Sequence, residues 1–251
     1  MKKIALGFIL LCSSVVAGTI NVAVAANVSY AINDLVAEFN KTNPDTKVQI
    51  TLGSSGKFTT QIENGAPFNI FMSADMKFPE TLFGKNLAIT KPVIYAQGSL
   101  AMLSSKELDF SKGINLVTDK NIEKVAIANP KTAPYGTAAV EAMKNAKVLD
   151  KVENKFVYAE SISQAVTYAT TAADVGFIAK SSLYDENMSK YKENVNWVSV
   201  DPSLYTPIDQ GIVILANAKD NSEAKAFYDF ILSEKAKEIF HRFGYLTKWI
   251  S

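Results

Sequence analysis

Two kinds of hydrophobic pattern alternate along most of the chain. Short apolar runs bounded by turn-forming residues are typical of buried strands. Segments with apolar residues every three or four positions are typical of amphipathic helices. The alternation of the two patterns predicts an α/β fold whose sheets are mixed but largely parallel. The strand-like runs are 19–24, 48–52, 69–72, 93–95, 100–103, 125–128, 156–159, 175–178, 195–200 and 208–216.

Helical segments follow most of these runs. The last of them extends over 222–243 with a continuous apolar face and Gly244 after it, which predicts one long C-terminal helix. The alanine-rich segment 137–147 and the segment 162–171 are two further predicted helices.

The length of the chain favours two lobes over a single core, because 251 residues exceed what one small core usually organises. Two short segments, 97–98 and 205–207, are the best places for the chain to cross between lobes. We therefore expect lobe I to comprise 18–96 plus 208–251 and lobe II to comprise 97–207. A ligand cleft would lie between them.

Composition excludes several classes of function. Net charge is +1, from 26 basic and 25 acidic residues, so nucleic acid is not an expected partner. Cys12 and His241 are the single cysteine and the single histidine. An internal disulfide and a multi-histidine zinc site are thereby excluded. We expect no metal ligands, no resident cofactor and no enzymatic activity.

The N-terminal segment has the pattern of an export signal. Lys2 and Lys3 precede an apolar run over 4–16 that ends in small residues. The run is shorter than the ~20 residues of a membrane span. We expect residues 1–17 to be a signal peptide and the protein to be periplasmic. Lipid attachment at Cys12 is the less favoured alternative, since Leu11 before it is bulky.

Four strand-to-helix turns carry the candidate chemistry, at 25–27, 53–56, 134–136 and 160–162. Ligands of α/β sheets gather beyond the carboxyl ends of the strands. The first N–H groups of a helix lack internal partners and carry partial positive charge. Four such ends around one cleft would bind an anion without a charged side chain. Asn27 and Ser55 could add an amide and a hydroxyl donor.

Other interpretations of the same residues remain open at this point. Serine, asparagine and glycine at helix starts often serve only as caps and turns. Ser54 or Ser55 could instead be a hydrolase nucleophile, which needs an activating base. His241 lies in the predicted C-terminal helix, which leaves Lys57 and Lys180 as activators. Asp75 is expected to cap a helix rather than to act as an acid.

The segment over 64–75, NGAPFNIFMSAD, resembles the segment that characterises periplasmic molybdate-binding proteins. The segments at 53–56, 175–178, 207–211, 226–231, 238–240 and 243–245 also fit that family in order and spacing. The resemblance implies a type II two-lobed periplasmic binding protein. Such a protein would deliver molybdate to the membrane permease of an ABC transporter and would act as a monomer.

The resemblance also implies a set of ligand residues. Asn27 and Ser55 match positions that bind through side chains, and Tyr135 and Ile162 match positions that bind through backbone N–H groups. Many family members carry a tyrosine where this chain has Ala179, and we expect Tyr135 to compensate for the missing hydroxyl.

The chemistry of the ligand agrees with such a site. Molybdate and tungstate are dianions that only accept hydrogen bonds, so a site of neutral donors satisfies them. Hydrogen bonds to a charged partner contribute about 1.5–3 kcal/mol each. The two anions are nearly equal in size, so both are expected to bind. A receptor for sulfate or another oxyanion remains the alternative within the same class.

Overall fold

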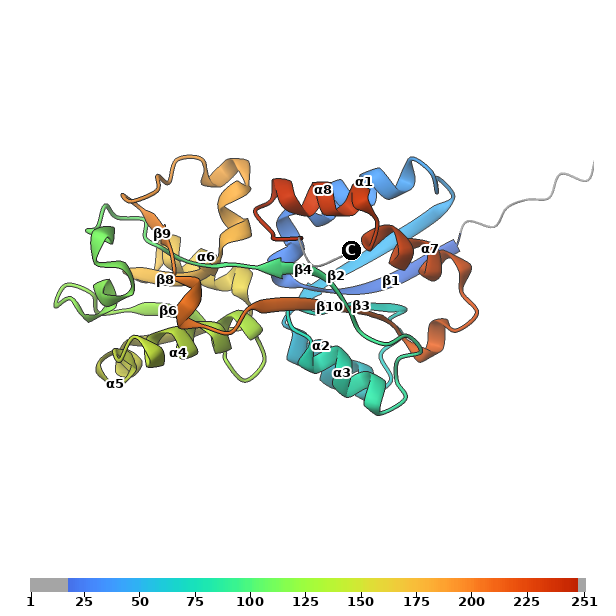
Figure 1. Cartoon of the computed structure of the whole chain (residues 1–251), viewed down its shortest axis with the longest axis horizontal. Coiled ribbons are helices and arrows are strands. Elements are labelled where there is room, and N and C mark those ends of the chain that lie inside the picture. The colour runs from blue at the N-terminus through green and yellow to red at the C-terminus, as the bar shows by residue number, and fades with distance from the viewer. Residues whose placement is uncertain (1–17, 248–251) are drawn as a thin grey trace, which may run out of the picture.

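Two five-stranded sheets lie side by side along the long axis of the molecule (Figure 1). The computed structural model describes residues 18–247. The predicted signal peptide over 1–17, with Cys12, lies outside the described residues. Within 18–247 no helix is both long and apolar enough to span a bilayer. The predicted two-lobed α/β fold with mixed sheets is confirmed.

The first sheet has the strand order β2-β1-β3-β10-β4. β1 runs parallel to β2 and β3, whereas β10 runs antiparallel to β3 and β4. The bounds of these strands are β1 Gly18–Ala25, β2 Thr46–Gly53, β3 Ile70–Met72, β4 Val93–Gly98 and β10 Ile208–Ile214.

Helices cover both faces of the first sheet, which explains why its central strands are apolar throughout (Figure 1). Successive side chains of a strand point to opposite faces. Val22 and Val24 accordingly pack in the core under α1, α7 and α8, and Ala23 packs under α2 and α3. The bounds of these helices are α1 Ile32–Asn40, α2 Ser55–Glu63, α3 Lys77–Gly84, α7 Ser222–Ile231 and α8 Glu234–Arg242.

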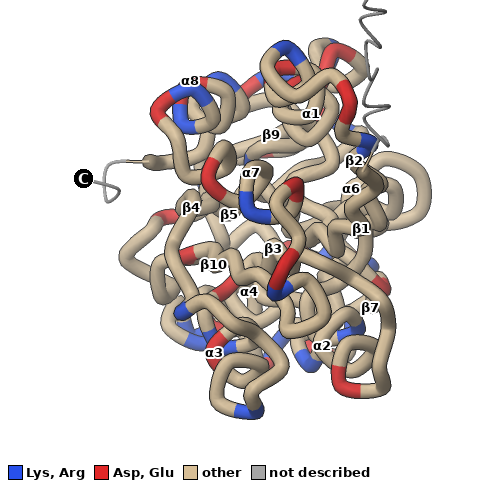
Figure 2. The backbone as a smooth tube through the Cα atoms, turned by 90° about the vertical axis from the view of Figure 1, so that its right-hand side faces the viewer, with Lys and Arg blue, Asp and Glu red and all other residues tan. Residues whose placement is uncertain are grey.

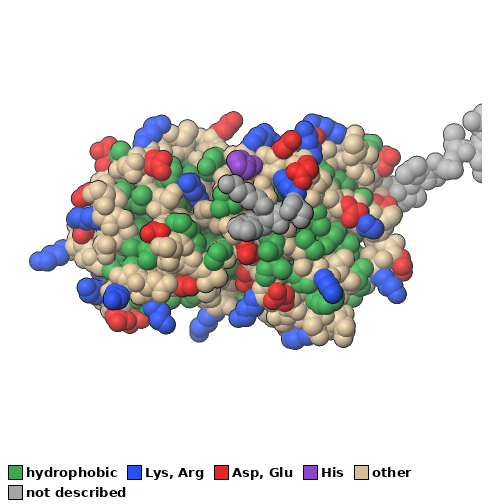
Figure 3. Space-filling model, in the orientation of Figure 1, with side chains coloured by type: hydrophobic (Ala, Val, Ile, Leu, Met, Phe, Trp, Pro, Cys, Tyr) green, Lys and Arg blue, Asp and Glu red, His purple; other side chains and the backbone are tan. Residues whose placement is uncertain are grey.

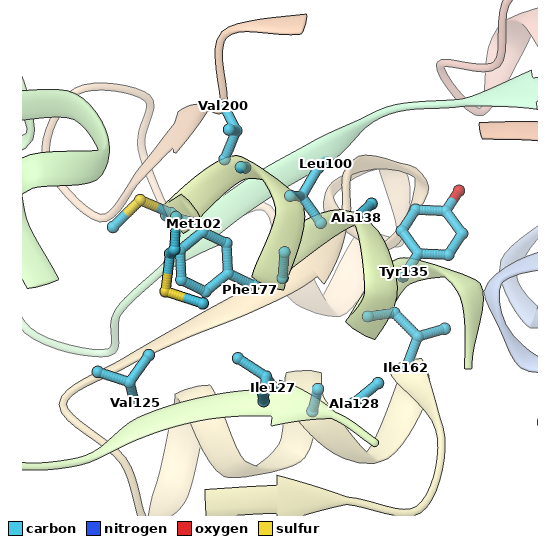
Figure 4. Packing of buried hydrophobic residues seen from close by; sticks show 14 of the residues in the cluster. Leu100, Met102, Val125, Ile127, Ala128, Tyr135, Ala138, Ile162, Phe177 and Val200 are labelled. Atoms are coloured by element: carbon cyan, nitrogen blue, oxygen red, sulfur yellow. The ribbon is translucent and has the colours of Figure 1, made fainter. Parts of the chain in front are cut away.

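The second sheet has the order β7-β6-β8-β5-β9 and holds its own core. β6 is parallel to β7 and β8, and β5 is antiparallel to β8 and β9. Met102, Ile127 and Phe177 from three of these strands pack against α4 (Figure 4). The bounds are β5 Leu100–Leu103, β6 Val125–Ala128, β7 Phe156–Ala159, β8 Val175–Ala179, β9 Trp197–Ser199, α4 Pro134–Asn145, α5 Leu149–Val152 and α6 Ile162–Thr171.

The chain passes between the sheets at two places. Ser99 alone separates β4 of the first sheet from β5 of the second, and residues 200–207 lead from β9 back to β10. Gly98 at the first crossing allows a close approach of other groups. A Cβ there would lie 1.9 Å from the Tyr135 hydroxyl and 2.6 Å from Gln210 Nε2, so no larger residue fits.

The long helix predicted over 222–243 is wrong, because the structure has α7 and α8 with a break at Leu232 and Ser233. The Ser233 hydroxyl accepts a hydrogen bond from the N–H of Ala236 at 3.3 Å and so starts a new helix. The apolar face continues across the break, which is why periodicity alone did not reveal it. α4 also begins earlier than predicted, at Pro134, a residue that suits a first helical position.

Charged residues of both signs are interspersed over the helices and loops (Figures 2 and 3). On the face shown in Figure 3 neither sign gathers into a large patch.

Candidate anion-binding site

One small cavity between the two sheets brings together all four sequence-predicted residues. Asn27, Ser55, Tyr135 and Ile162 all line it. The first two come from the first half of the molecule and the other two from α4 and α6 of the second. None of the described residues that line it carries a charged side chain.

Each contributing turn places the start of a helix at the cavity. Asn27 lies in a 3-10 helix over Ala26–Tyr30, directly after β1. Ser55 and Ile162 are the first residues of α2 and α6, and Tyr135 is the second residue of α4. Backbone N–H groups at such positions have no carbonyl partner within their helix. The partial positive charge of the helix starts adds to these donors.

The Ser55 hydroxyl is positioned to donate a hydrogen bond to a ligand. Its oxygen accepts a hydrogen bond from the N–H of Ala74 at 3.0 Å, and the residue is buried. Because this bond uses a lone pair and not the proton, the O–H stays available for a ligand.

Ser54 is a second buried hydroxyl at the cavity, and its oxygen has no hydrogen-bond partner. The sequence singled it out only as a candidate nucleophile. An unpartnered buried hydroxyl costs free energy unless a ligand or water satisfies it.

Asn27 belongs to a buried polar cluster that sequence analysis missed. Its Nδ2 donates to Gln210 Oε1 at 2.9 Å and to the Tyr245 hydroxyl at 3.0 Å. Its backbone carbonyl accepts from Tyr245 at 2.7 Å and from the Ser181 hydroxyl at 3.1 Å. The Asn27 Oδ1 is buried and has no partner. In the sequence, Gln210 and Tyr245 stand out only as members of the segments at 207–211 and 243–245 that resemble the family.

Tyr135 extends this cluster to α4. Its hydroxyl accepts from Gln210 Nε2 at 3.1 Å, and Tyr95 donates to Gln210 Oε1 at 2.8 Å. Burial raises the pKa of Tyr95, Tyr135 and Tyr245, so all three remain protonated donors at neutral pH. Ala179 is also buried, at the end of β8, and the expected compensation by the Tyr135 hydroxyl for the missing tyrosine stays a prediction.

Contacts between the two halves enclose the cavity. The N–H of Gly56 donates to the carbonyl of Thr132 at 2.8 Å, and the Ser163 hydroxyl donates to the carbonyl of Ala26 at 2.8 Å. Lys57 and Glu160 form an ion pair across the same boundary. A Cβ on Gly56 would lie 2.9 Å from Thr132 Cα, so the approach at this point depends on glycine.

None of the three candidate bases for a serine nucleophile lines the cavity. Lys57 is paired with Glu160, and Lys180 Nζ lies 5.7 Å from the centre of the Trp197 ring. His241 is exposed on α8. Asp75 accepts a hydrogen bond from the N–H of Phe78 at 3.2 Å, in the first turn of α3, as expected of a cap. Within residues 18–247 no group of three acidic, histidine or cysteine residues could hold a metal ion.

The two-sheet fold and its neutral, donor-lined cavity define a two-lobed solute-binding protein. The model of the family described as bacterial extracellular solute-binding protein matches residues 20–246. The chain therefore belongs to this family, whose members act outside the cytoplasm.

Named relatives confirm the resemblance found in the sequence. The molybdate-binding protein ModA of Azotobacter vinelandii is 37% identical, over 96% of this chain and 95% of that protein. ModA of Rhodobacter capsulatus is 39% identical, over 92% of this chain and 90% of that protein. The solved periplasmic molybdate-binding protein of A. vinelandii superposes with a TM-score of 0.83 at 30% identity, covering 90% of this chain and 98% of that one. These relatives are binding proteins by name.

The buried Tyr245 hydroxyl predicts how stability depends on alkaline pH. Its raised pKa means that the folded state holds a proton that the unfolded chain releases above about pH 10. Its contribution is complete below about pH 10 and is lost as pH rises further, by about 1.4 kcal/mol per pH unit. Tyr245→Phe should therefore make the fall in unfolding free energy between about pH 10 and about pH 11 shallower in urea titrations.

Tyr158→Phe is the control for this prediction, since that side chain is 57% exposed. The control should leave the slope of stability against pH unchanged. Equal slopes for the wild type and Tyr245→Phe would show that burial of this hydroxyl is not linked to folding.

Proposed function

We propose that this protein captures molybdate in the periplasm and delivers it to the permease of an ABC transporter, and that it binds tungstate as well. The observation that carries the proposal is the neutral cavity of buried donors between the two sheets. The names of relatives at 37% and 39% identity support the choice of anion.

The chemistry of binding follows from the groups at the cavity. The Ser55 hydroxyl and the N–H groups of Tyr135 and Ile162 donate to the oxygens of the anion, and the Asn27 amide adds a further donor. A fully deprotonated dianion accepts all of these bonds and offers none in return. Bonds of this kind contribute about 1.5–3 kcal/mol each, so several together give tight binding. Excluding water from the closed cavity strengthens every one of them.

Delivery requires that the two halves separate and close. We propose that residues 18–96 plus 208–251 form one lobe, that 97–207 form the other, and that the strands crossing between them act as the hinge. The closed form presents the surface that the permease recognises, and the protein acts as a monomer. A signal peptide over 1–17 directs export.

Calorimetric titration of the purified protein with molybdate, tungstate and sulfate tests the proposed function. We expect comparable, tight binding of molybdate and tungstate, and binding of sulfate at least about a hundredfold weaker, a difference of about 2.7 kcal/mol. The smaller sulfate ion would leave some donors out of reach. Equal affinity for sulfate would make this a general oxyanion receptor, and no binding of any of the three would refute the proposal.

Removing the Ser55 hydroxyl tests the donor set itself. Ser55→Ala should weaken molybdate binding by about 1–3 kcal/mol, and Asn27→Ala by a similar amount, because each removes one neutral donor to a charged oxygen. Ser111→Ala is the matched control, since Ser111 is exposed and its hydroxyl donates to Asp109. Unchanged affinity in both site variants would remove these residues from the site.

Gly56→Ala tests the closed arrangement. The added methyl group collides with the backbone of Thr132 and should hold the halves apart. With saturating molybdate the variant should keep a larger radius of gyration in small-angle X-ray scattering than the wild type, and its affinity should fall at least about tenfold. In Gly84→Ala, where a Cβ meets nothing within 4 Å, both quantities should match the wild type. Normal closure of Gly56→Ala would contradict the role assigned to this contact.

A further inference from the structure

We propose that Gln210 is a positioning residue that sets the orientation of the Asn27 side-chain amide, and so decides whether the cavity presents a donor or an acceptor there. The inference rests on the proposed function, because it concerns how the same cavity selects a fully deprotonated oxyanion. Gln210 lies in β10, is completely buried, and does not line the cavity itself.

In the observed orientation the free end of the Asn27 amide is its oxygen, which cannot donate a hydrogen bond to an anion. Both protons of Nδ2 are used, one by Gln210 and one by Tyr245, while Oδ1 has no partner. Asn27 lines the cavity, so the free end of its amide is the end available to a ligand. A carbonyl oxygen there would repel a dianion and would suit an oxyanion that still carries a proton.

Rotating the side-chain amides of Asn27 and Gln210 by about 180° keeps every heavy-atom contact. It places Asn27 Nδ2 rather than Oδ1 at the cavity. Oxygen and nitrogen of a side-chain amide exchange places on such a rotation. Asn27 Oδ1 then accepts from Gln210 Nε2, and the Tyr135 hydroxyl donates to Gln210 Oε1. The Tyr95 hydroxyl accepts a hydrogen bond from the second N–H of Gln210 Nε2. It still donates to the carbonyl of Ser73 at 3.1 Å.

The remaining members of the cluster also stay satisfied. Tyr245 donates to Asn27 Oδ1, and the Ser181 hydroxyl donates to the backbone carbonyl of Asn27, which lies 3.1 Å away. Asn27 Nδ2 then faces the cavity with its protons free. The rotated arrangement thus removes the unpartnered buried oxygen and presents a donor to the anion.

The two amides must rotate together. If Asn27 turned alone, its Oδ1 would face Gln210 Oε1 across the 2.9 Å that now holds a hydrogen bond, with no proton between them. Gln210 therefore controls the end of the Asn27 amide that an oxyanion meets. Gly98 leaves room for this exchange, since a Cβ there would lie within 2.6 Å of Gln210 Nε2.

The experiment compares Gln210→Leu and Gln210→Glu with the same substitution at Gln49, an exposed glutamine on β2. Molybdate is titrated calorimetrically from about pH 6.5 to about pH 9, where a buried glutamate can titrate. Gln210→Leu should weaken binding at least about tenfold, because the Asn27 amide is then held by the Tyr245 hydroxyl, which can donate or accept and so does not fix its orientation. The control Gln49→Leu should stay within about twofold of the wild type, since Gln49 is exposed on β2 and belongs to neither crossing.

Gln210→Glu gives a readout that a purely structural role would not move. As a carboxylate, the new side chain only accepts, so it draws Asn27 Nδ2 to itself and weakens binding. As a carboxylic acid, it donates and accepts as glutamine does. Affinity of this variant should therefore rise as pH falls, while that of the wild type stays constant.

The groups that face position 210 cannot produce this pH dependence. The hydroxyls of Tyr95 and Tyr135 contact it directly, and their raised pKa keeps them protonated throughout the range. The nearest carboxylates along the chain and across the sheet, Asp209 and Asp75, are present in the wild type as well.

Nuclear Overhauser effects in the wild-type complex test the same inference without a substitution. With molybdate bound, the Gln210 Nε2 protons should show contacts to the Tyr95 ring rather than to the Tyr135 ring. Contacts to Tyr135 alone would overturn the inference, as would a Gln210→Glu variant whose affinity does not change with pH, or a Gln210→Leu variant with wild-type affinity. Failure of the wild type to bind any oxyanion would instead overturn the proposed function, and this inference with it.

Discussion

Buried hydrogen-bond donors without protein partners are the constraint on which this structure depends. A buried hydrogen-bond donor costs free energy until an acceptor forms a hydrogen bond with it. Here the hydroxyl of Ser55 and the first N–H groups of α2, α4 and α6 meet at one buried cavity. An anion that only accepts hydrogen bonds relieves that cost, and no positive side chain is needed to attract it. Neutral donors also avoid the desolvation penalty of a buried lysine or arginine.

The fold serves this constraint by bringing the ends of strands from two sheets to one place. The chain crosses once through Ser99 and returns through 200–207, so each sheet keeps its own core while sharing a boundary. Glycines at the boundary allow the close approaches, Gly98 beside Tyr135 and Gly56 beside Thr132. The buried cluster of Asn27, Gln210 and three tyrosines then links the two halves behind the cavity.

Much of this could be predicted from the sequence, because apolar runs and helix starts are local signals. The strand over 156–159 and the helix over 162–171 have the predicted bounds, and the four predicted site residues meet at one cavity. The break before Ser233 was missed because the apolar face continues through it. Gln210 and Tyr245 were missed for a different reason: they contact Asn27 across 183 and 218 residues of chain, and no local pattern encodes such contacts.

A crystal structure of the molybdate complex would test the central claim most directly. The account predicts a tetrahedral oxyanion in the cavity, with its oxygens within about 3.2 Å of Ser55 Oγ and of the backbone nitrogens of Tyr135 and Ile162. The Asn27 amide nitrogen should complete the set, with no lysine or arginine nitrogen in contact. An anion held instead by Arg242 or by a group of lysines would contradict the account.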